Sequence, residues 1–392
     1  MQIRVTELLP DVVSWRHHLH ESPELEFDVL NTADFVAQKL REFGCDDVIE
    51  GIGRSGVVGT IKGRRSSAGR TVALRADMDA LPIAETTNLP YRSRVPGLMH
   101  ACGHDGHTSM LLGAARYLAE TRNFSGTVAL VFQPAEEGGA GGAQAMIEDG
   151  LMERFGIDEI YGMHNWPGIP VGSFAIRPGS LMAAFDSFSI EVEGKGGHAA
   201  TPDKAVDTVV VLASIVNALQ SIVSRNVDPR EAVVISTCQI HAGEADNVIP
   251  QFGRLSGSVR TLTAAASRFC EERMRIIAES TARAYGATTK VLYNHTIPAM
   301  VNDIKCTGYL VDAATSVVGP EHVDTAISPQ MGSEDFAAFL LKRPGAFILI
   351  GNGETESLHH PAYDFNDAAL PYGLSLWIKI AEDRLSEASA RC

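Results

Sequence analysis

Apolar residues in the first half of the chain alternate between continuous runs and segments with helical spacing. The runs that begin at Thr71, Gly126 and Ile157 predict buried strands, because each is short, apolar and followed by turn residues. The segments that begin at Thr32 and Thr108 carry apolar residues at helical spacing and predict helices. Strands that alternate with helices in this way indicate an α/β domain with a mostly parallel sheet covered by helices.

The pattern changes at Phe185. The segment FDSFSIEVEG predicts an alternating strand, and Pro202, at a favoured first helical position, predicts the start of a helix. Two strands follow, EAVVISTCQIHAG and NVIPQFGRLSGSVRT, and then a long helix from about Ala264 to Tyr285 and the strand TTKVLYNHTIP. The order βαββαβ is the ferredoxin-like arrangement, with an antiparallel sheet.

The α/β pattern resumes after Val301 with a helix, the strand GAFILIGNG and a closing helix. The sequence therefore predicts one α/β domain, residues 1–182 and 298–392, interrupted by a smaller inserted α+β domain, residues 183–297.

Composition narrows the class of protein. The net charge of −15 disfavours nucleic-acid binding, which requires clustered Lys and Arg, and 45% hydrophobic residues are typical of a globular protein. The amino terminus does not resemble a signal peptide, and no uninterrupted apolar run approaches the ~18–20 residues of a membrane span. The cysteines lack paired spacing, so we expect free thiols in a reducing cytoplasm; they are Cys45, Cys102, Cys238, Cys270, Cys306 and Cys392.

Candidate metal ligands gather near the predicted strand ends. Cys102 and His104, with Gly103 between them, suit a loop folded around an ion. Thiolate and imidazole favour zinc or other late first-row metals, whereas a carboxylate-rich shell suits manganese. A lone Cys or His is more often structural, but other donors follow neighbouring strands, where ligands of parallel sheets bind. They are Glu136, Glu137, His164 and the pair His359 and His360; the polar pair Asp77 and Asp79 also stands at a predicted strand end, which favours a function for it.

The adjacent pair Glu136–Glu137 suggests two roles. Consecutive side chains cannot face the same way, so one carboxylate can bind an ion while the other faces an activated water as general base. Two carboxylates in a dry site repel each other unless a cation is near. A solvated acidic loop is the alternative, but the glycines that follow allow close backbone approach and favour the functional interpretation.

Several motifs in order resemble the M20 metallopeptidases, and more narrowly their N-acyl-amino-acid amidohydrolase branch, which contains hippurate hydrolases and auxin-conjugate hydrolases. The resemblance covers about Trp15 to Trp377. It rests on RHHLHESPELEF, LRADMDALPI, MHACGHDGHTSMLLGAA, FQPAEEGGAGG, GMHNWPGIPVG, GKGGHAATPDKAVD, NVIP, MGSEDFA and LHHPAYDFND.

The resemblance implies a zinc-peptidase-like catalytic domain and a two-metal site. The implied metal ligands are Cys102, His104, Glu137, His164 and one histidine of LHHP, where the family pattern selects His359 over His360. Glu136 would be the general base and Asp77 an active-site carboxylate, while His100, His107 and His360 are left as capping or packing groups. The cations expected are Mn²⁺ or Zn²⁺, with Ni²⁺ or Co²⁺ as alternatives.

The resemblance also gives the inserted domain a function, because relatives dimerise through it. His198 is expected to reach a neighbouring active site and stabilise an oxyanion, and Asn247 and Arg260 to hold the substrate carboxylate. Two of them have an alternative without a catalytic role: His198 as a polar loop residue and Arg260 as a solvated side chain on a strand. The partners expected are a small-molecule substrate and a second copy of the chain, in a homodimer or a tetramer, with no nucleic acid and no membrane.

The function expected from these observations is metal-dependent hydrolysis of N-acyl-L-amino acids to a carboxylic acid and a free amino acid. The alternatives within the family are a deacetylase of the N-acetyl-diaminopimelate type and a dipeptidase. Outside it are a metal-dependent binding protein without activity and a structural zinc protein, which predicts a single closed four-ligand site.

Overall fold

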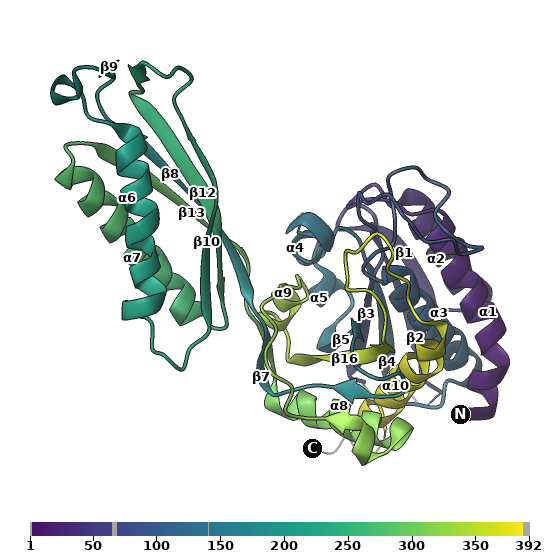
Figure 1. The fold of residues 1–392 in the computed structure, drawn as a ribbon. Coiled ribbons are helices and arrows are strands. Elements are labelled where there is room, and N and C mark those ends of the chain that lie inside the picture. Colours follow the sequence, from purple (N-terminus) through teal and green to yellow (C-terminus); the bar gives the residue numbers. More distant parts are fainter. Residues whose placement is uncertain (1, 65–68, 140, 387–392) are drawn as a thin grey trace. The chain divides into compact units, whose positions relative to one another are not determined.

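The computed structural model describes residues 2–64, 69–139 and 141–386, and the chain divides into two units (Figure 1). Unit 1 contains the described residues of 1–179, 301–328 and 335–392. Unit 2 contains residues 180–300 and 329–334. A small two-stranded sheet, β7 (Gly179–Met182) with β14 (Met300–Asn302), lies where the chain passes from one unit to the other.

Unit 1 is built on an eight-stranded sheet in the order β1-β2-β4-β3-β5-β16-β6-β15. Its central strands β4, β3, β5 and β16 run parallel, whereas β1, β2 and β6 join antiparallel. This confirms the predicted α/β fold with a mostly parallel sheet. The strands are β1 (Asp47–Ile52), β2 (Gly56–Lys62), β3 (Thr71–Asp77), β4 (Thr127–Gln133), β5 (Ile157–Pro167), β6 (Phe174–Ala175), β15 (Val323–Asp324) and β16 (Gly345–Gly353).

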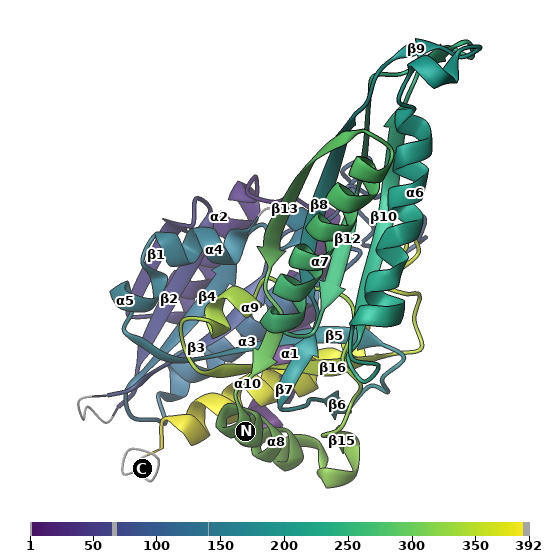
Figure 2. The same cartoon turned by 90° about the vertical axis from the view of Figure 1, so that its left-hand side faces the viewer.

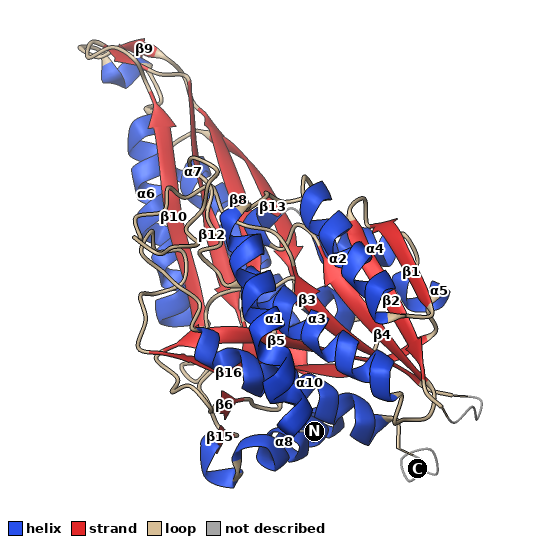
Figure 3. Cartoon of the chain, turned by 90° about the vertical axis from the view of Figure 1, so that its right-hand side faces the viewer, coloured by secondary structure: helices blue, strands red, loops and turns tan. Residues whose placement is uncertain are grey.

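Helices cover both faces of this sheet (Figures 1 and 3). The helices α2, α3, α8 and α10 pack on one face, with α1 lying on α3 and α10, and the short α4, α5 and α9 lie on the other. Every residue of β3 is buried, as expected for a strand covered on both sides. The helices are α1 (Gln2–Glu21), α2 (Leu30–Phe43), α3 (His104–Thr121), α4 (Gly142–Glu148), α5 (Leu151–Arg154), α8 (Ile304–Val318), α9 (Ala337–Leu340) and α10 (Leu370–Arg384).

Unit 2 has a four-stranded antiparallel sheet in the order β10-β12-β8-β13, with α6 and α7 on one face (Figure 2). This is the predicted ferredoxin-like order. At one end, β9 and β11 form a separate two-stranded sheet. The elements are β8 (Ala184–Glu193), β9 (Gly197–His198), α6 (Thr208–Ser221), β10 (Val233–Ala242), β11 (Val248–Ile249), β12 (Phe252–Thr261), α7 (Ala264–Ala284) and β13 (Thr288–Ile297).

Two predicted helix starts were wrong. Helix α3 begins at His104 and not at Thr108, because Gly103 turns the backbone directly into the helix. Helix α6 begins at Thr208 and not at Pro202, which starts only a short 3₁₀ turn. The Asp207 carboxylate accepts hydrogen bonds from the first helical N–H groups and so fixes the later start.

The segment Thr208–Asn226 is long and apolar enough to cross a membrane by length and composition, although only 33% of it is buried. It contains α6, which packs on β8, β10 and β12, and the valines Val209 and Val210 on its outer side are 46% exposed. Among the described cysteines, Cys45, Cys102, Cys238, Cys270 and Cys306 are free thiols, as predicted, and Cys392 lies outside the described residues.

Candidate metal centre

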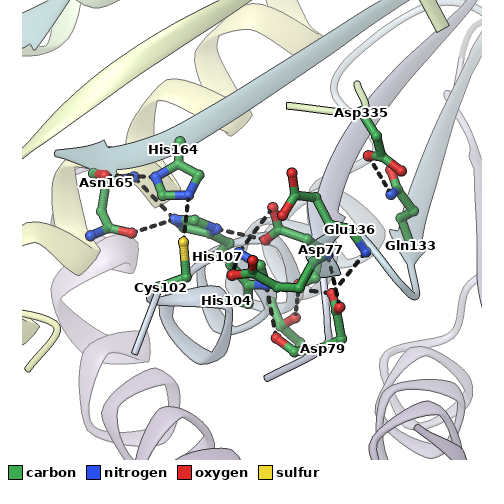
Figure 4. Close-up of polar contacts among 12 residues, drawn as sticks. Asp77, Asp79, Cys102, His104, His107, Gln133, Glu136, His164, Asn165 and Asp335 are labelled. Atoms are coloured by element: carbon green, nitrogen blue, oxygen red, sulfur yellow. Dashed lines mark hydrogen bonds and ion pairs between the residues drawn. The ribbon is translucent and has the colours of Figure 1, made fainter. Parts of the chain in front are cut away.

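The predicted site residues of unit 1 converge where the parallel strands end (Figure 4). Asp77 is the last residue of β3, and Glu136 and Glu137 follow β4 directly. His164 lies in β5, and Cys102 and His104 stand at the start of α3. The carboxyl ends of neighbouring parallel strands share one edge, so residues far apart in sequence meet there.

Gly103, between Cys102 and His104, has φ of +91°, a backbone conformation that side-chain-bearing residues rarely adopt. A Cβ atom there would lie 2.3 Å from Oδ1 of Asn165. Glycine is therefore required for the chain to pass this close to β5 while turning into α3.

Two groups of donor atoms share Cys102. One contains Cys102, His104 and His164, the other Cys102, Glu137 and His359, and within each group the ligand atoms lie within 4.8 Å of one another. The Cys102 sulfur is 3.3 Å from Nε2 of His164, and the Glu137 carboxylate is 3.4 Å from Nε2 of His359. A donor common to two groups is the arrangement expected for two neighbouring cations.

The hydrogen bonds of both buried histidines leave Nε2 available. Nδ1 of His104 lies 2.8 Å from the carbonyl oxygen of Asp79, and Nδ1 of His164 lies 2.7 Å from that of Asn165. A carbonyl only accepts, so Nδ1 carries a proton and Nε2 is the ring nitrogen left to bind a cation. Metal-binding histidines are commonly oriented in this way.

Asp77 is fully buried and held on both sides. Arg75 donates to one of its oxygens at 2.7 Å, and Nδ1 of His107 donates to the other at 2.6 Å. Nε2 of His107 accepts from the backbone N–H of Asn165 at 3.0 Å, so both ring nitrogens have partners in the chain. Asp77 is thus a fixed carboxylate at the edge of the site. Against the effect of burial, His104 and then Arg75 keep its pKa well below the ordinary range.

Asp79 fixes the loop that carries Glu136 and Glu137. Its two carboxylate oxygens accept the consecutive backbone N–H groups of these residues, at 3.1 Å and 3.0 Å (Figure 4). Ala135, just before them, has φ of +52°, so the chain adopts an unfavourable turn to present both N–H groups. Asp79 thereby orients both glutamates through its carboxylate and His104 through its backbone carbonyl.

The chemistry of these donors fits divalent cations. Glu137 Oε1 and His104 Nε2 are buried without a hydrogen-bond partner, which is costly unless an ion occupies the space between them. Burial raises the pKa of the Cys102 thiol well above its ordinary value, and Glu137 and Glu136 add to the effect. Although burial opposes it, Asp77 and Asp79 raise the pKa of His104 to about 10. These groups hold protons that a cation would replace.

The remaining histidines of the two motifs do not join these groups. His100 is buried with neither ring nitrogen hydrogen-bonded, and burial lowers its pKa to about 3. His360 is exposed, and its Nδ1 accepts from the backbone of Ala362 at 3.1 Å. The structure thus gathers His359 with Cys102 and Glu137, as the motif pattern suggested.

The three residues expected to contact substrate from the inserted domain lie in unit 2. His198 and Asn247 come together, because β9 pairs with β11, and both line a hollow of about 580 Å³ formed by 196–198 and 247–251. Arg260 lies near the far end of β12, beside Ser333 and over the Phe185 ring. The length of β12, at ~3.3 Å per residue, separates Arg260 from Asn247, so one copy of unit 2 does not bring them to one point.

Comparison with known proteins identifies the family. A family model described as Peptidase family M20/M25/M40 matches residues 73–383. The chain belongs to this family. The M20 chain is 44% identical over 366 residues to the hippurate hydrolase of Campylobacter jejuni, an alignment that covers 93% of this chain and 94% of the relative.

Two further relatives are similar over nearly the whole M20 chain. The N-acetylcysteine deacetylase of Bacillus subtilis is 39% identical, with 94% of this chain and 96% of the relative covered. The solved structure of the Bacillus subtilis YXEP protein, described as a dinuclear metal binding peptidase from the M20 family, matches with a TM-score of 0.85 and 35% identity. That match covers 97% of this chain and 99% of YXEP, and together with the donor groups it supports a site for two divalent metals.

Sequence reasoning did not assign functions to Asp79 and Asn165. The Asp79 carboxylate binds backbone N–H groups, and the carbonyl groups of Asp79 and Asn165 orient His104 and His164; residue type and spacing do not reveal such contacts. Their positions gave a partial signal, since Asp79 follows the end of β3 and Asn165 follows His164.

Metal binding should release protons. Near neutral pH both Cys102 and His104 hold protons in the absence of a cation, so binding should displace about two and affinity should rise by up to ~100-fold per pH unit. Calorimetric titration with Mn²⁺ between pH 6 and 8, in buffers of different ionisation enthalpy, measures both quantities. An affinity independent of pH would contradict this assignment of ligands.

Proposed function

We propose that this M20 enzyme hydrolyses the amide bond of N-acyl-L-amino acids, giving a carboxylic acid and a free amino acid. The observation that carries the proposal is the pair of donor groups sharing Cys102, with the Glu136 carboxylate beside them, within 4.8 Å of ligand atoms of His104 and Glu137. Two of the relatives support the substrate class, because a hippurate hydrolase and an N-acetylcysteine deacetylase both act on an acylated amino acid.

Cations bound at this site, Mn²⁺ or Zn²⁺ by their donor preferences, would polarise the amide carbonyl and acidify a water molecule. Glu136 then takes a proton from the attacking water and delivers it to the leaving amine. Asp79 supports this role, because it fixes the Glu136 backbone and leaves the side chain to face the shared site. Glu137, held by the same carboxylate, is assigned to binding a cation.

We assign His198 as the donor to the oxyanion. The backbone N–H of Ala200 donates to its Nδ1 at 3.0 Å, so the ring proton of neutral His198 is on Nε2, which is available as a donor. His198 is exposed beside the β9 turn, so a substrate bound to another chain can reach it. Asn247, beside it, and Arg260, with its fork suited to carboxylates, are assigned to the substrate's free carboxylate.

The separation of Asn247 and Arg260 within one unit supports a homodimer in which His198 and Asn247 serve the partner's active site. The exposed valines of α6 and the unpaired edge of β10 offer a self-complementary surface for it. The free described cysteines support a reducing cytoplasm as the compartment.

A substrate panel tests the proposed function. The purified, Mn²⁺-loaded enzyme should release amino acid from hippurate, N-acetyl amino acids or auxin conjugates, measured by ninhydrin or mass spectrometry. Dipeptides and N-acetyl-diaminopimelate are included in the panel to test the two alternative activities within the family. Turnover of dipeptides alone would replace our proposal with a dipeptidase, and two bound cations without any turnover would favour a binding protein.

Adjacent substitutions separate the two glutamates. Glu136→Gln should keep both cations and lower kcat by roughly 10²–10⁴-fold, because only the base is lost. Glu137→Gln, the matched control one residue away, should lose bound metal. Elemental analysis and kcat are measured on the same samples. A Glu136→Gln enzyme with near-normal kcat would remove its role as base.

Mixing inactive variants tests whether His198 acts across a dimer. His198→Ala and Glu136→Gln homodimers should each be nearly inactive. If the chains exchange, a mixed dimer has one intact site, which combines Glu136 of one chain with His198 of the other. An equal mixture should therefore regain about a quarter of wild-type activity. Failure to regain activity, with mixed dimers shown by native mass spectrometry, would place His198 in its own chain's site or outside catalysis.

A further inference from the structure

The motif RHHLH of α1 lies outside the metal centre, yet two of its residues are fully buried and charged partners surround them. Arg16 and His20 have no exposed surface. A buried guanidinium and a buried imidazole on one helix require partners, because an unpaired buried charge is strongly unfavourable. Their partners come from the two segments that carry Cys102, His104 and His359.

Arg16 binds the segment that follows His359. Its Nη1 is 3.2 Å from Asp364 Oδ1, and its Nε is 2.8 Å from Asp367 Oδ1. The guanidinium lies 4.2 Å over the Tyr91 ring, whose hydroxyl donates to Asp364 at 3.0 Å. His17, next in the motif, stacks on the other side of this cluster against Tyr91 and lies 2.8 Å from Asp367.

His20 binds the segment that carries Cys102 and His104. Its Nδ1 lies 2.8 Å from the carboxylate of Asp105, the residue after His104, and Nε2 lies 3.4 Å from Glu85. Although burial opposes it, Asp105 raises the pKa of His20 to about 9, so the contact is an ion pair at neutral pH. Arg16 Nη1 is 3.5 Å from the same Asp105 oxygen and so joins the two segments.

The His359 segment needs such support. The His359 side chain is 53% exposed, its backbone has φ of +65°, and one backbone hydrogen bond, from His359 N to Ala101 O at 2.8 Å, joins it to the Cys102 segment. His104 and His164, by contrast, are buried and oriented by carbonyl groups. The two donor groups are therefore held with different rigidity.

We propose that Arg16 is a positioning residue that sets the affinity of the cation bound by Cys102, Glu137 and His359, whereas His20 supports both cations through the shared Cys102 segment. This inference rests on the proposed two-metal site. It goes beyond that site because it proposes that residues of α1 determine how the affinities for the two cations differ. Arg16 touches no candidate ligand and acts mainly through Asp364 and Asp367, at 3.2 Å and 2.8 Å, because its contact with Asp105 is longer, at 3.5 Å.

The test is a calorimetric titration of the full-length, chelator-treated protein with Mn²⁺ alone. Arg16→Lys keeps the charge but loses the fork that joins several carboxylates. It should weaken one binding step by ~10–100-fold, the range for groups that orient ligands, and leave the other within about threefold. His20→Asn should weaken both steps. Electron paramagnetic resonance at two equivalents should show coupled Mn²⁺ ions in the wild type and mainly isolated ions in Arg16→Lys.

Arg4→Lys is the matched control, since Arg4 lies on the same helix and pairs with the exposed Glu7 and Glu120. It should change neither step. If Arg16→Lys does not fold, Asp367→Asn is used instead. Asp367 is partly exposed, and its substitution removes the ion pair with Arg16 by changing the other partner.

Unchanged affinities in Arg16→Lys or Asp367→Asn, or equal weakening of both steps in parallel with the melting temperature of the metal-free protein, would overturn the positioning role alone. A wild-type protein that binds fewer than two Mn²⁺ ions would overturn the proposed two-metal site together with it.

Discussion

The crowding of buried carboxylates at the carboxyl ends of β3 and β4 is the constraint on which the rest of the structure depends. Asp77, Asp79, Glu136 and Glu137 are all buried within a few residues of these strand ends. Each buried charge would cost several kcal/mol without compensation. Arg75 and His107 compensate Asp77, and consecutive backbone N–H groups compensate Asp79. The remaining negative charge falls on Glu136 and Glu137 beside the Cys102 thiol, and this is the excess that cations can neutralise.

The fold class was largely predictable because the type of sheet in each unit, mostly parallel or antiparallel, follows from hydrophobic patterns and an order of elements that extend over many residues. Fully apolar runs mark strands covered on both faces, and the alternation of β8 marks a strand with one open face. The starts of α3 and α6 were not predictable in the same way. One residue determines each start. Gly103, in the left-handed conformation, lets α3 begin at His104, before the predicted position. Asp207 caps α6 at Thr208, although Pro202 is a residue type favoured at first helical positions.

The convergence of the candidate metal ligands was predictable because thiol, imidazole and carboxylate groups have few other reasons to gather at strand ends. The groups that aim them were not, since Asp79 binds backbone N–H groups and Asn165 presents its carbonyl to His164. Such contacts depend on where two loops meet and leave no periodic mark in the sequence. The same holds for Arg16: RHHLH was visible as a motif, but only the tertiary structure shows that its charges face Asp105, Asp364 and Asp367.

The position of Arg260 bears on how a complete active site is assembled. Strand β12 is paired on both sides along its length, with β10 and β8, so it does not fold back to bring Arg260 to Asn247. If both residues contact one substrate carboxylate, they come from different chains, and the same argument applies to His198, which is tied to Asn247 by the β9–β11 pairing. A site divided between chains also gives α6 a reason for its apolar outer side. Val209 and Val210 are 46% exposed in the single chain, and an isologous contact, in which one hydrophobic face meets its own copy, would bury them. In the proposed dimer, the apolar helix and the distant arginine would be two consequences of one requirement, that the partner chain complete the site.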